Sequence, residues 1–216
     1  MNMDLNNNPQ PPFDGEQKDI ADPAETEAPK SEDPKSRIRK FASDIFEIIE
    51  MFTVCASVIM ILFTFILHPT VVDGPSMENT LLHGDYLLIS ALPYEPEAGD
   101  IVVVHNVGLR HYSKPIIKRI IATEGQTVDI DFETWTVTVD GNVIDEPYMK
   151  LAADGYITSD WSYPIVIPEG HVFVMGDNRN HSADSRSREI GLIDERCIVG
   201  KAVVRVFPFT RFTVFN

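Results

Sequence analysis

The sequence predicts a mainly β domain, built as a β-barrel or folded-sheet assembly and preceded by one N-terminal transmembrane α-helix. The helix is predicted by Met51–Leu67, a run of 17 residues without a charge, since an apolar helix of about 20 residues crosses a bilayer. The β domain is predicted by the residues after Pro69, where short β-branched and aromatic runs alternate with turn residues. A chain of 216 residues suits one such domain with accessory segments.

Residues 1–36 are predicted to be a disordered acidic tail on the cytoplasmic side. They hold nine acidic residues, three lysines and six prolines, and Phe13 is their one aromatic residue. This composition buries too little apolar surface to offset the entropy lost on ordering. A docking motif is the alternative interpretation of the segment.

Residues 37–68 are predicted to be a basic flank followed by a single transmembrane helix. Four basic residues lie between positions 35 and 40, whereas residues 68–109 contain no Lys or Arg. The positive-inside rule therefore places the N-terminus in the cytoplasm and the bulk of the chain outside. The long acidic leader and the lack of a small-residue cleavage site after Leu67 disfavour a cleaved signal peptide. An apolar stripe at helical spacing over residues 41–52 predicts that the helix begins before the membrane.

Residues 69–216 are predicted to form the extracytoplasmic β domain. Asp140-Gly141-Asn142 between two β-like runs is a hairpin signal. Residues from about 132 to 168 combine this hairpin with a stretch rich in Pro, Gly, Asp and aromatic residues, which predicts an inserted hairpin or cap. The predicted strands are Tyr86–Ala91, Asp100–Val104, Ile116–Ala122, Gln126–Ile130, Thr134–Val139, His171–Met175 and Cys197–Phe207.

The composition also excludes several functions. The formal net charge of −15 disfavours a nucleic-acid partner, which would need a basic face. Cys55 and Cys197 are too few for a disulfide framework or a four-cysteine zinc site, and no histidine pair has metal-ligand spacing. We therefore expect no metal. The phenylalanines near the C-terminus could contact lipid head groups or be buried; they are Phe207, Phe209, Phe212 and Phe215.

Ser76 is the first candidate for chemistry. It follows Gly74-Pro75, which predicts a turn that exposes its hydroxyl. It lies nine residues beyond Leu67, so it is expected near the outer membrane surface. A serine in a turn is usually no more than a turn residue, and a base is needed to make it a nucleophile.

Lys118 is the candidate base. Strand alternation places it on the same face as Ile116 and Ile120. Such a lysine either extends past the edge of the apolar face or is buried. If it is buried without a carboxylate partner, its pKa falls and its neutral amine can activate a serine hydroxyl. His181 is the alternative base, and we interpret it as a loop residue.

A polar loop from Gly176 to Arg186 is the third candidate region. It follows the apolar strand His171–Met175 and is dense in short side chains that cap, bridge and orient. Asp184 and Arg186 can pair within it, and Ser182 can hydrogen-bond a neighbour. A solvated loop is the alternative interpretation.

Together these segments resemble the type I (leader) signal peptidase family of membrane-anchored Ser-Lys serine endopeptidases. The resemblance covers residues from about 40 to 207 and departs at Asn79, where a proline is usual. It implies a signal-peptidase-like catalytic domain in which Ser76 is the nucleophile and Lys118 the general base. It further implies that Ser182 orients the amine, that Asp184 and Arg186 form a structural ion pair, and that Asp177 supports the same loop.

The resemblance also implies an activity and its partners. The enzyme would remove signal peptides from exported preproteins at the outer face of the cytoplasmic membrane, after small-x-small sites such as Ala-x-Ala. It would use an acyl-enzyme, need no cofactor, contact the lipid bilayer and act as a monomer. A dedicated peptidase for pilin or envelope precursors and a catalytically inactive chaperone are the alternatives. The residues expected to line the substrate pocket are Val72, Gly74, Met77, Leu81 and Ile117.

Overall fold

The computed structural model describes residues 33–105, 114–151 and 159–215. The predicted disordered tail therefore lies almost wholly outside the described residues. Within them the chain has one long helix, two antiparallel sheets and short 3₁₀ turns. The predicted class, a mainly β fold with one N-terminal apolar helix, is confirmed.

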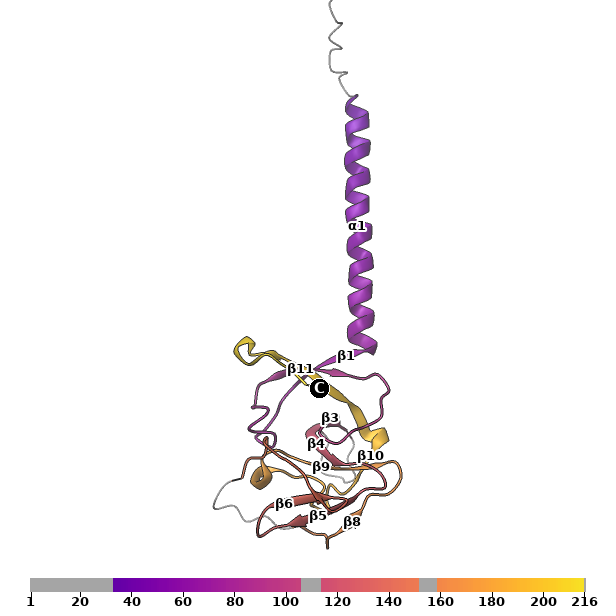
Figure 1. The fold of residues 1–216 in the computed structure, drawn as a ribbon. Helices are drawn as coiled ribbons and strands as arrows, with labels where there is room; N and C mark the ends of the chain where they lie inside the picture. Colours follow the sequence, from indigo (N-terminus) through magenta and orange to yellow (C-terminus); the bar gives the residue numbers. More distant parts are fainter. Residues whose placement is uncertain (1–32, 106–113, 152–158, 216) are drawn as a thin grey trace, which may run out of the picture. The chain divides into compact units, whose positions relative to one another are not determined.

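Helix α1 (Pro34–Phe65) carries the apolar run (Figure 1). Asp33 lies just before it, and its carboxylate accepts a hydrogen bond from the Lys35 N–H at 3.2 Å. Pro34 suits the first helical position because its φ is already set for a helix. The 32 residues span roughly 48 Å at 1.5 Å per residue, which exceeds a hydrocarbon core of about 30 Å. Among the described residues this is the one helix long and apolar enough to cross a membrane.

The larger sheet has eight strands, all paired antiparallel. Its order is β1-β2-β11-β3-β4-β9-β10, and β12 also pairs with β11. Register shifts in β11 after Ala202 and Arg205 mark bulges, and bulges bend and twist a strand. The strands are β1 (Leu67–Val71), β2 (Tyr86–Ser90), β3 (Ile101–Val104), β4 (Ile116–Ala122), β9 (His171–Met175), β10 (Ile193–Asp194), β11 (Ile198–Phe207) and β12 (Thr213–Val214).

The helix gives way to β1 within the run that the sequence presents as continuous. The helix ends at Phe65, and Leu67 already pairs with Ser90 of β2. Pro69 lies inside β1, which an edge strand tolerates because one side of it has no ladder partner. The first strand of the domain therefore begins immediately after the helix.

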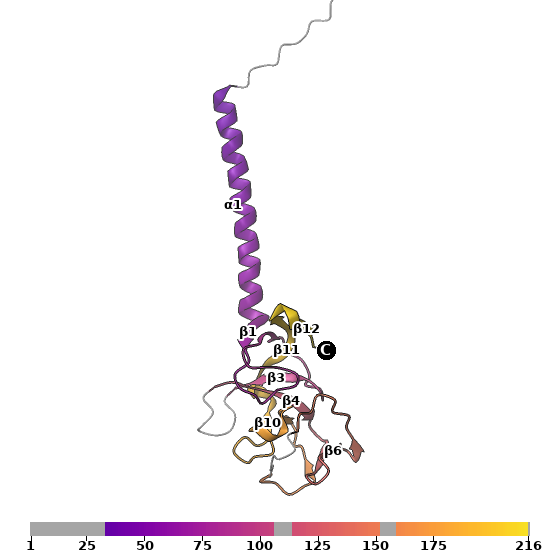
Figure 2. The ribbon, with the colours of Figure 1, turned by 90° about the vertical axis from the view of Figure 1, so that its left-hand side faces the viewer.

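The smaller sheet has the order β7-β6-β5-β8. Asp140 and Gly141 join β6 to β7 with φ values of 52° and 77°, as a type I′ hairpin turn requires. The sheet includes β5 and so begins before the predicted insertion at residue 132. In both views β3 and β4 separate it from β1 and β11 (Figure 1, Figure 2). Its strands are β5 (Thr127–Asp131), β6 (Thr136–Val139), β7 (Asn142–Val143) and β8 (Ile165–Val166).

The C-terminal phenylalanines divide between the two expected environments. Phe207, Phe209 and Phe212 are 47%, 80% and 59% exposed, whereas Phe215 packs against a buried cluster that includes Met77 and Leu81. Burial therefore accounts for Phe215, and contact with lipid stays a prediction for the other three.

Candidate active site

Ser76 lies on the loop between β1 and β2, and this loop is fixed at both ends. The Val72 N–H donates to the Asp85 carbonyl and the Gly84 N–H donates to the Val72 carbonyl, both at 2.9 Å. Gly74 has a φ of +101°, which an L side chain rarely adopts, so glycine suits the turn before Ser76. Met77 is 1% exposed and anchors the turn in the core. The turn predicted from the sequence is therefore held in place by the core and by the backbone hydrogen bonds at both ends of the loop.

Lys118 lies on β4 with its amine against that serine. Nζ is 2.9 Å from Ser76 Oγ and 2.9 Å from the Ile117 carbonyl oxygen. The side chain is buried, with 3% of the residue exposed. The sequence left open whether this lysine extends past the edge of the apolar face or is buried, and in the structure it is buried.

Burial sets the proton affinity of the amine. It lowers the pKa of Lys118 from 10.5 to about 8, because removal of water disfavours the charged form. The negative charges of Asp184 and Asp177 work in the opposite direction, and the positive charge of Arg186 adds to the lowering. A substantial fraction of the amine is therefore neutral close to neutral pH and can accept a proton.

The end of β9 brings the polar loop against the serine. The Asn178 N–H donates to the Ser76 carbonyl at 3.0 Å, and Asn178 Nδ2 donates to the Pro75 carbonyl at 3.1 Å. A Cβ on Gly176 would lie 2.5 Å from the Ser76 carbonyl oxygen and 2.2 Å from Ser182 Oγ. Only glycine allows so close an approach, so this loop and the nucleophile turn are packed directly together.

Asp184 and Arg186 form a buried ion pair in that loop. Arg186 donates to both carboxylate oxygens, at 2.7 and 2.8 Å, and the Gly176 N–H donates to the same carboxylate at 2.9 Å. Burial alone would raise the pKa of Asp184, but the hydrogen bonds and charge of Arg186 lower that pKa below its usual value. Ser182 Oγ is buried beside this pair, and its hydroxyl also helps to lower the pKa of Asp184. His181 is exposed.

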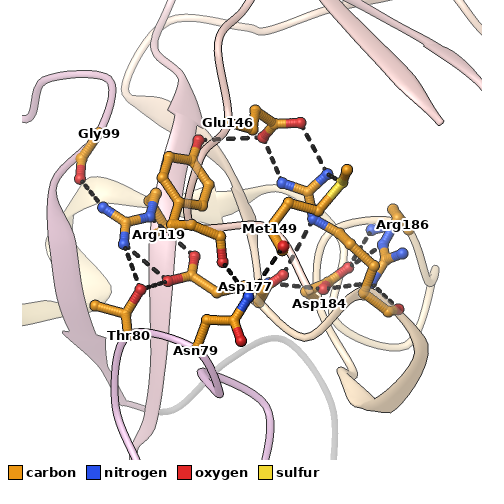
Figure 3. Close-up of polar contacts among 12 residues, drawn as sticks. Asn79, Thr80, Gly99, Arg119, Glu146, Met149, Asp177, Asp184 and Arg186 are labelled. Carbon is orange, nitrogen blue, oxygen red and sulfur yellow. Dashed lines mark hydrogen bonds and ion pairs between the residues drawn. The ribbon is translucent and has the colours of Figure 1, made fainter. Parts of the chain in front are cut away.

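A second buried ion pair joins the strand that carries Lys118 to the polar loop after β9. Arg119 donates from Nε and Nη2 to the two Asp177 oxygens at 2.9 and 2.8 Å, and from Nη1 to the Gly99 carbonyl at 2.8 Å (Figure 3). The Thr80 hydroxyl also donates to Asp177. The Asp177 side chain thus reaches beyond its own loop. The sequence assigned no role to Arg119 or Thr80, although each neighbours a candidate residue.

A groove opens at the dyad between the end of β1 and the start of β4. Three of the five predicted pocket residues, Val72, Met77 and Ile117, line it, while Gly74 and Leu81 do not. Leu81 is a fully buried core residue. The lining residues are Thr70, Val71, Val72, Asp73, Ser76, Met77, Val103, Pro115, Ile116, Ile117 and Lys118.

Comparisons with known sequences point to one family. The sequence profile described as "Signal peptidase, peptidase S26" matches residues 45–207. Signal peptidase I of Bacillus licheniformis is 33% identical over 180 residues, which cover 77% of this chain and 91% of that protein. Signal peptidase IB of Staphylococcus aureus (strain COL) is 34% identical over 185 residues, covering 78% and 93%. A crystal structure of a signal peptidase I from Enterococcus faecalis V583 aligns with 50% of this chain and 97% of its own, at 24% identity and a TM-score of 0.41.

Proposed function

Because the chain belongs to the signal peptidase family, peptidase S26, we propose that it cleaves signal peptides from exported preproteins by Ser-Lys catalysis. The observation that carries the proposal is the 2.9 Å contact between Ser76 Oγ and the buried amine of Lys118. This contact also disfavours the alternative of a catalytically inactive chaperone, since such a protein would have no use for a desolvated lysine beside a serine.

The mechanism follows from the two side chains. Neutral Lys118 takes the Ser76 proton while Oγ attacks the scissile carbonyl, and the resulting ammonium then gives a proton to the leaving amine. Water attacks the acyl-enzyme with Lys118 again as the base. The Ser76 N–H donates to no acceptor among the described residues, so it is free to stabilise the oxyanion. Pro75 has no N–H to offer.

The neighbouring residues have supporting roles in this proposal. Ser182 orients the amine of Lys118, and its support is a buried hydroxyl that faces Gly176 beside the dyad. The Asp184–Arg186 pair shapes the loop from within, since its carboxylate also holds the Gly176 N–H. Asp177 links its own loop to the Lys118 strand through Arg119 and to the Ser76 loop through Thr80.

The family supports a preference for small residues at positions −1 and −3 before the cut, and we propose that they bind in the groove at the dyad. The full-length chain in detergent should cleave a precursor carrying Ala-x-Ala directly after the second alanine. A leucine at −1 should slow cleavage about 10–200-fold, because extra methylene groups overfill a small apolar pocket. Mass spectrometry of the new N-terminus and initial rates check both results. Equal rates for the two precursors, or a cut elsewhere, would contradict the proposed specificity.

We further propose that α1 crosses the membrane once, with the N-terminus in the cytoplasm and the β domain outside. The support is the basic flank at residues 35–40 before the apolar run. In intact cells, protease added outside should remove a C-terminal epitope and spare an N-terminal one. A control variant with Arg37, Arg39 and Lys40 changed to Glu should show a mixed or reversed pattern. Protection of the C-terminal epitope in the unaltered chain would overturn this orientation.

A further inference from the structure

The residues Glu146–Lys150 follow the hairpin of the smaller sheet. They contact three parts of the chain that carry or adjoin the dyad. We refer to them as the 146–150 segment. Its contacts reach the loop that carries Ser76, the strand that carries Lys118 and the polar loop after β9. None of its side chains has a hydrogen bond with Ser76 Oγ or Lys118 Nζ. Its effect on the dyad must therefore be exerted through the neighbours of those two residues.

Asn79 links the segment to the nucleophile loop. Its φ is +67°, a conformation that Asn tolerates better than most residues and that proline cannot adopt. Its amide nitrogen donates to the Met149 carbonyl at 3.1 Å and to the Tyr148 carbonyl at 3.4 Å (Figure 3). Asparagine in place of the usual proline therefore allows a hydrogen bond between position 79 and Met149, which is 70 positions away.

Tyr148 links the segment to the base strand. The Arg119 guanidinium lies over its ring, 3.9 Å from the centroid, which is a favourable cation–π geometry. Arg119 directly follows Lys118 and is also held by Asp177. The Tyr148 hydroxyl donates to Glu146, which in turn forms a buried ion pair with Arg179. The ring thus covers one face of a guanidinium whose edges are already bound.

Lys150 links the segment to the polar loop and again to the nucleophile loop. Its N–H donates to the Asp177 carbonyl at 2.7 Å, and its carbonyl accepts from the Arg179 N–H at 2.9 Å. Its Nζ pairs with Glu78 at 2.6 Å, and Asn178 Nδ2 lies 3.4 Å from the same carboxylate. These backbone and side-chain bonds fix the segment on both of its neighbours at once.

We infer that the 146–150 segment is a positioning element that keeps the Ser76 loop and the Lys118 strand in reacting geometry, with Asn79 and Tyr148 as its positioning residues. The inference rests on the proposed function, since it assigns a task in that reaction. It predicts that loosening the segment acts on turnover more than on substrate binding, because the groove is lined by other residues.

The test uses graded substitutions in the full-length chain. Tyr148→Ala should lower kcat about 10–100-fold, as displacements of about 1 Å do, with KM changed by no more than about threefold. Tyr148→Phe keeps the ring over Arg119 and should restore most of kcat. Asn79→Gly keeps the positive φ but removes the amide, and should lower kcat about 3–10-fold. Val143→Thr, at an exposed position of the smaller sheet, is the matched control and should match the wild type.

Two further readouts separate positioning from a merely structural role. The pH profile of kcat/KM for Tyr148→Ala should shift to higher pH, since a loosened site admits water to the amine and raises its pKa from about 8. The double variant Asn79→Gly/Tyr148→Ala should lose less than the product of the single losses, because both act through one element. Thermal melting curves confirm that each variant is folded at the assay temperature.

The outcomes distinguish this inference from the proposed function. If the wild type cleaves and Ser76→Ala does not, the proposed function stands. In that case, unchanged kcat and pH profiles in folded Tyr148→Ala and Asn79→Gly would overturn the inference alone. A rise in KM at constant kcat, or fully multiplicative losses in the double variant, would overturn it too. A wild type that cleaves no precursor would overturn both.

Discussion

A Lys118→Met variant should lose about 10³-fold or more in turnover and at the same time become more stable at neutral pH. Turnover falls because thioether sulfur cannot take the Ser76 proton. Stability rises because the wild type buries an amine whose pKa is lowered from 10.5 to about 8. At about 1.4 kcal/mol per pKa unit, the cost of holding this amine protonated is roughly 3 kcal/mol. The variant also loses the hydrogen bond to the Ile117 carbonyl, which offsets part of this gain. We therefore expect the free energy of unfolding to rise by about 1–3 kcal/mol.

The pH dependence fixes the sign of this effect. Well below pH 8 the lysine is largely protonated in both the folded and the unfolded chain, so the penalty is fully present. Between pH 8 and pH 10.5 the unfolded chain binds more protons, so wild-type stability gains from this group as the pH rises, and the advantage of Lys118→Met shrinks. Denaturant unfolding of the full-length chain at pH 6.5, 8 and 10 measures the trend.

Activity should also rise with pH, because the same deprotonation supplies the neutral base. Wild-type kcat/KM should rise with pH and level off above about 8, as the neutral amine becomes the main form. Ser76→Ala is the matched control, because it should abolish turnover without the gain in stability at pH 6.5. A flat profile between pH 6 and 9, or substantial turnover by Lys118→Met, would show that another group is the base.

Local patterns in the sequence were sufficient to mark Ser76 and Lys118 as candidates, and the family resemblance then implied their roles as a dyad. Gly74-Pro75 predicts the turn that presents Ser76, and strand alternation places Lys118 on an apolar face. Whether the lysine is buried or exposed depends on which strands cover it, and alternation alone does not determine that. The structure resolves the question through the pairing of β4 with β3 and β9.

The supporting contacts were not predicted because they join residues distant in sequence. Arg119 meets Asp177 across 58 positions, and Asn79 meets Met149 across 70. A single sequence carries no signal for such pairs, and a positive φ at Asn79 has no propensity strong enough to reveal it. The first two residues of β1, Leu67 and His68, fell within the predicted helical segment, because Leu67 continues the apolar run.

Gly176→Ala should lower kcat about 10²–10³-fold while the chain remains folded. The added methyl would lie 2.5 Å from the Ser76 carbonyl oxygen and 2.2 Å from Ser182 Oγ, well inside van der Waals contact. The serine side chain can rotate away, whereas the carbonyl is held by the Asn178 N–H. Relief of the clash must therefore move the nucleophile loop relative to Lys118. Initial rates and melting curves on the same preparations measure the effect.

A matched control separates loss of geometry from crowding as such. A Cβ on Gly200 of β11 would lie 2.3 Å from the Ser90 carbonyl oxygen, an equal clash between strands that do not carry the dyad. Gly200→Ala should therefore lower the melting temperature and leave kcat per folded molecule near the wild-type value. In Gly176→Ala/Ser182→Ala the hydroxyl clash is gone but the carbonyl clash persists, so kcat should stay low. Recovery of kcat in that double variant would mean that the close contact with Ser182, rather than with the Ser76 backbone, is what the glycine protects.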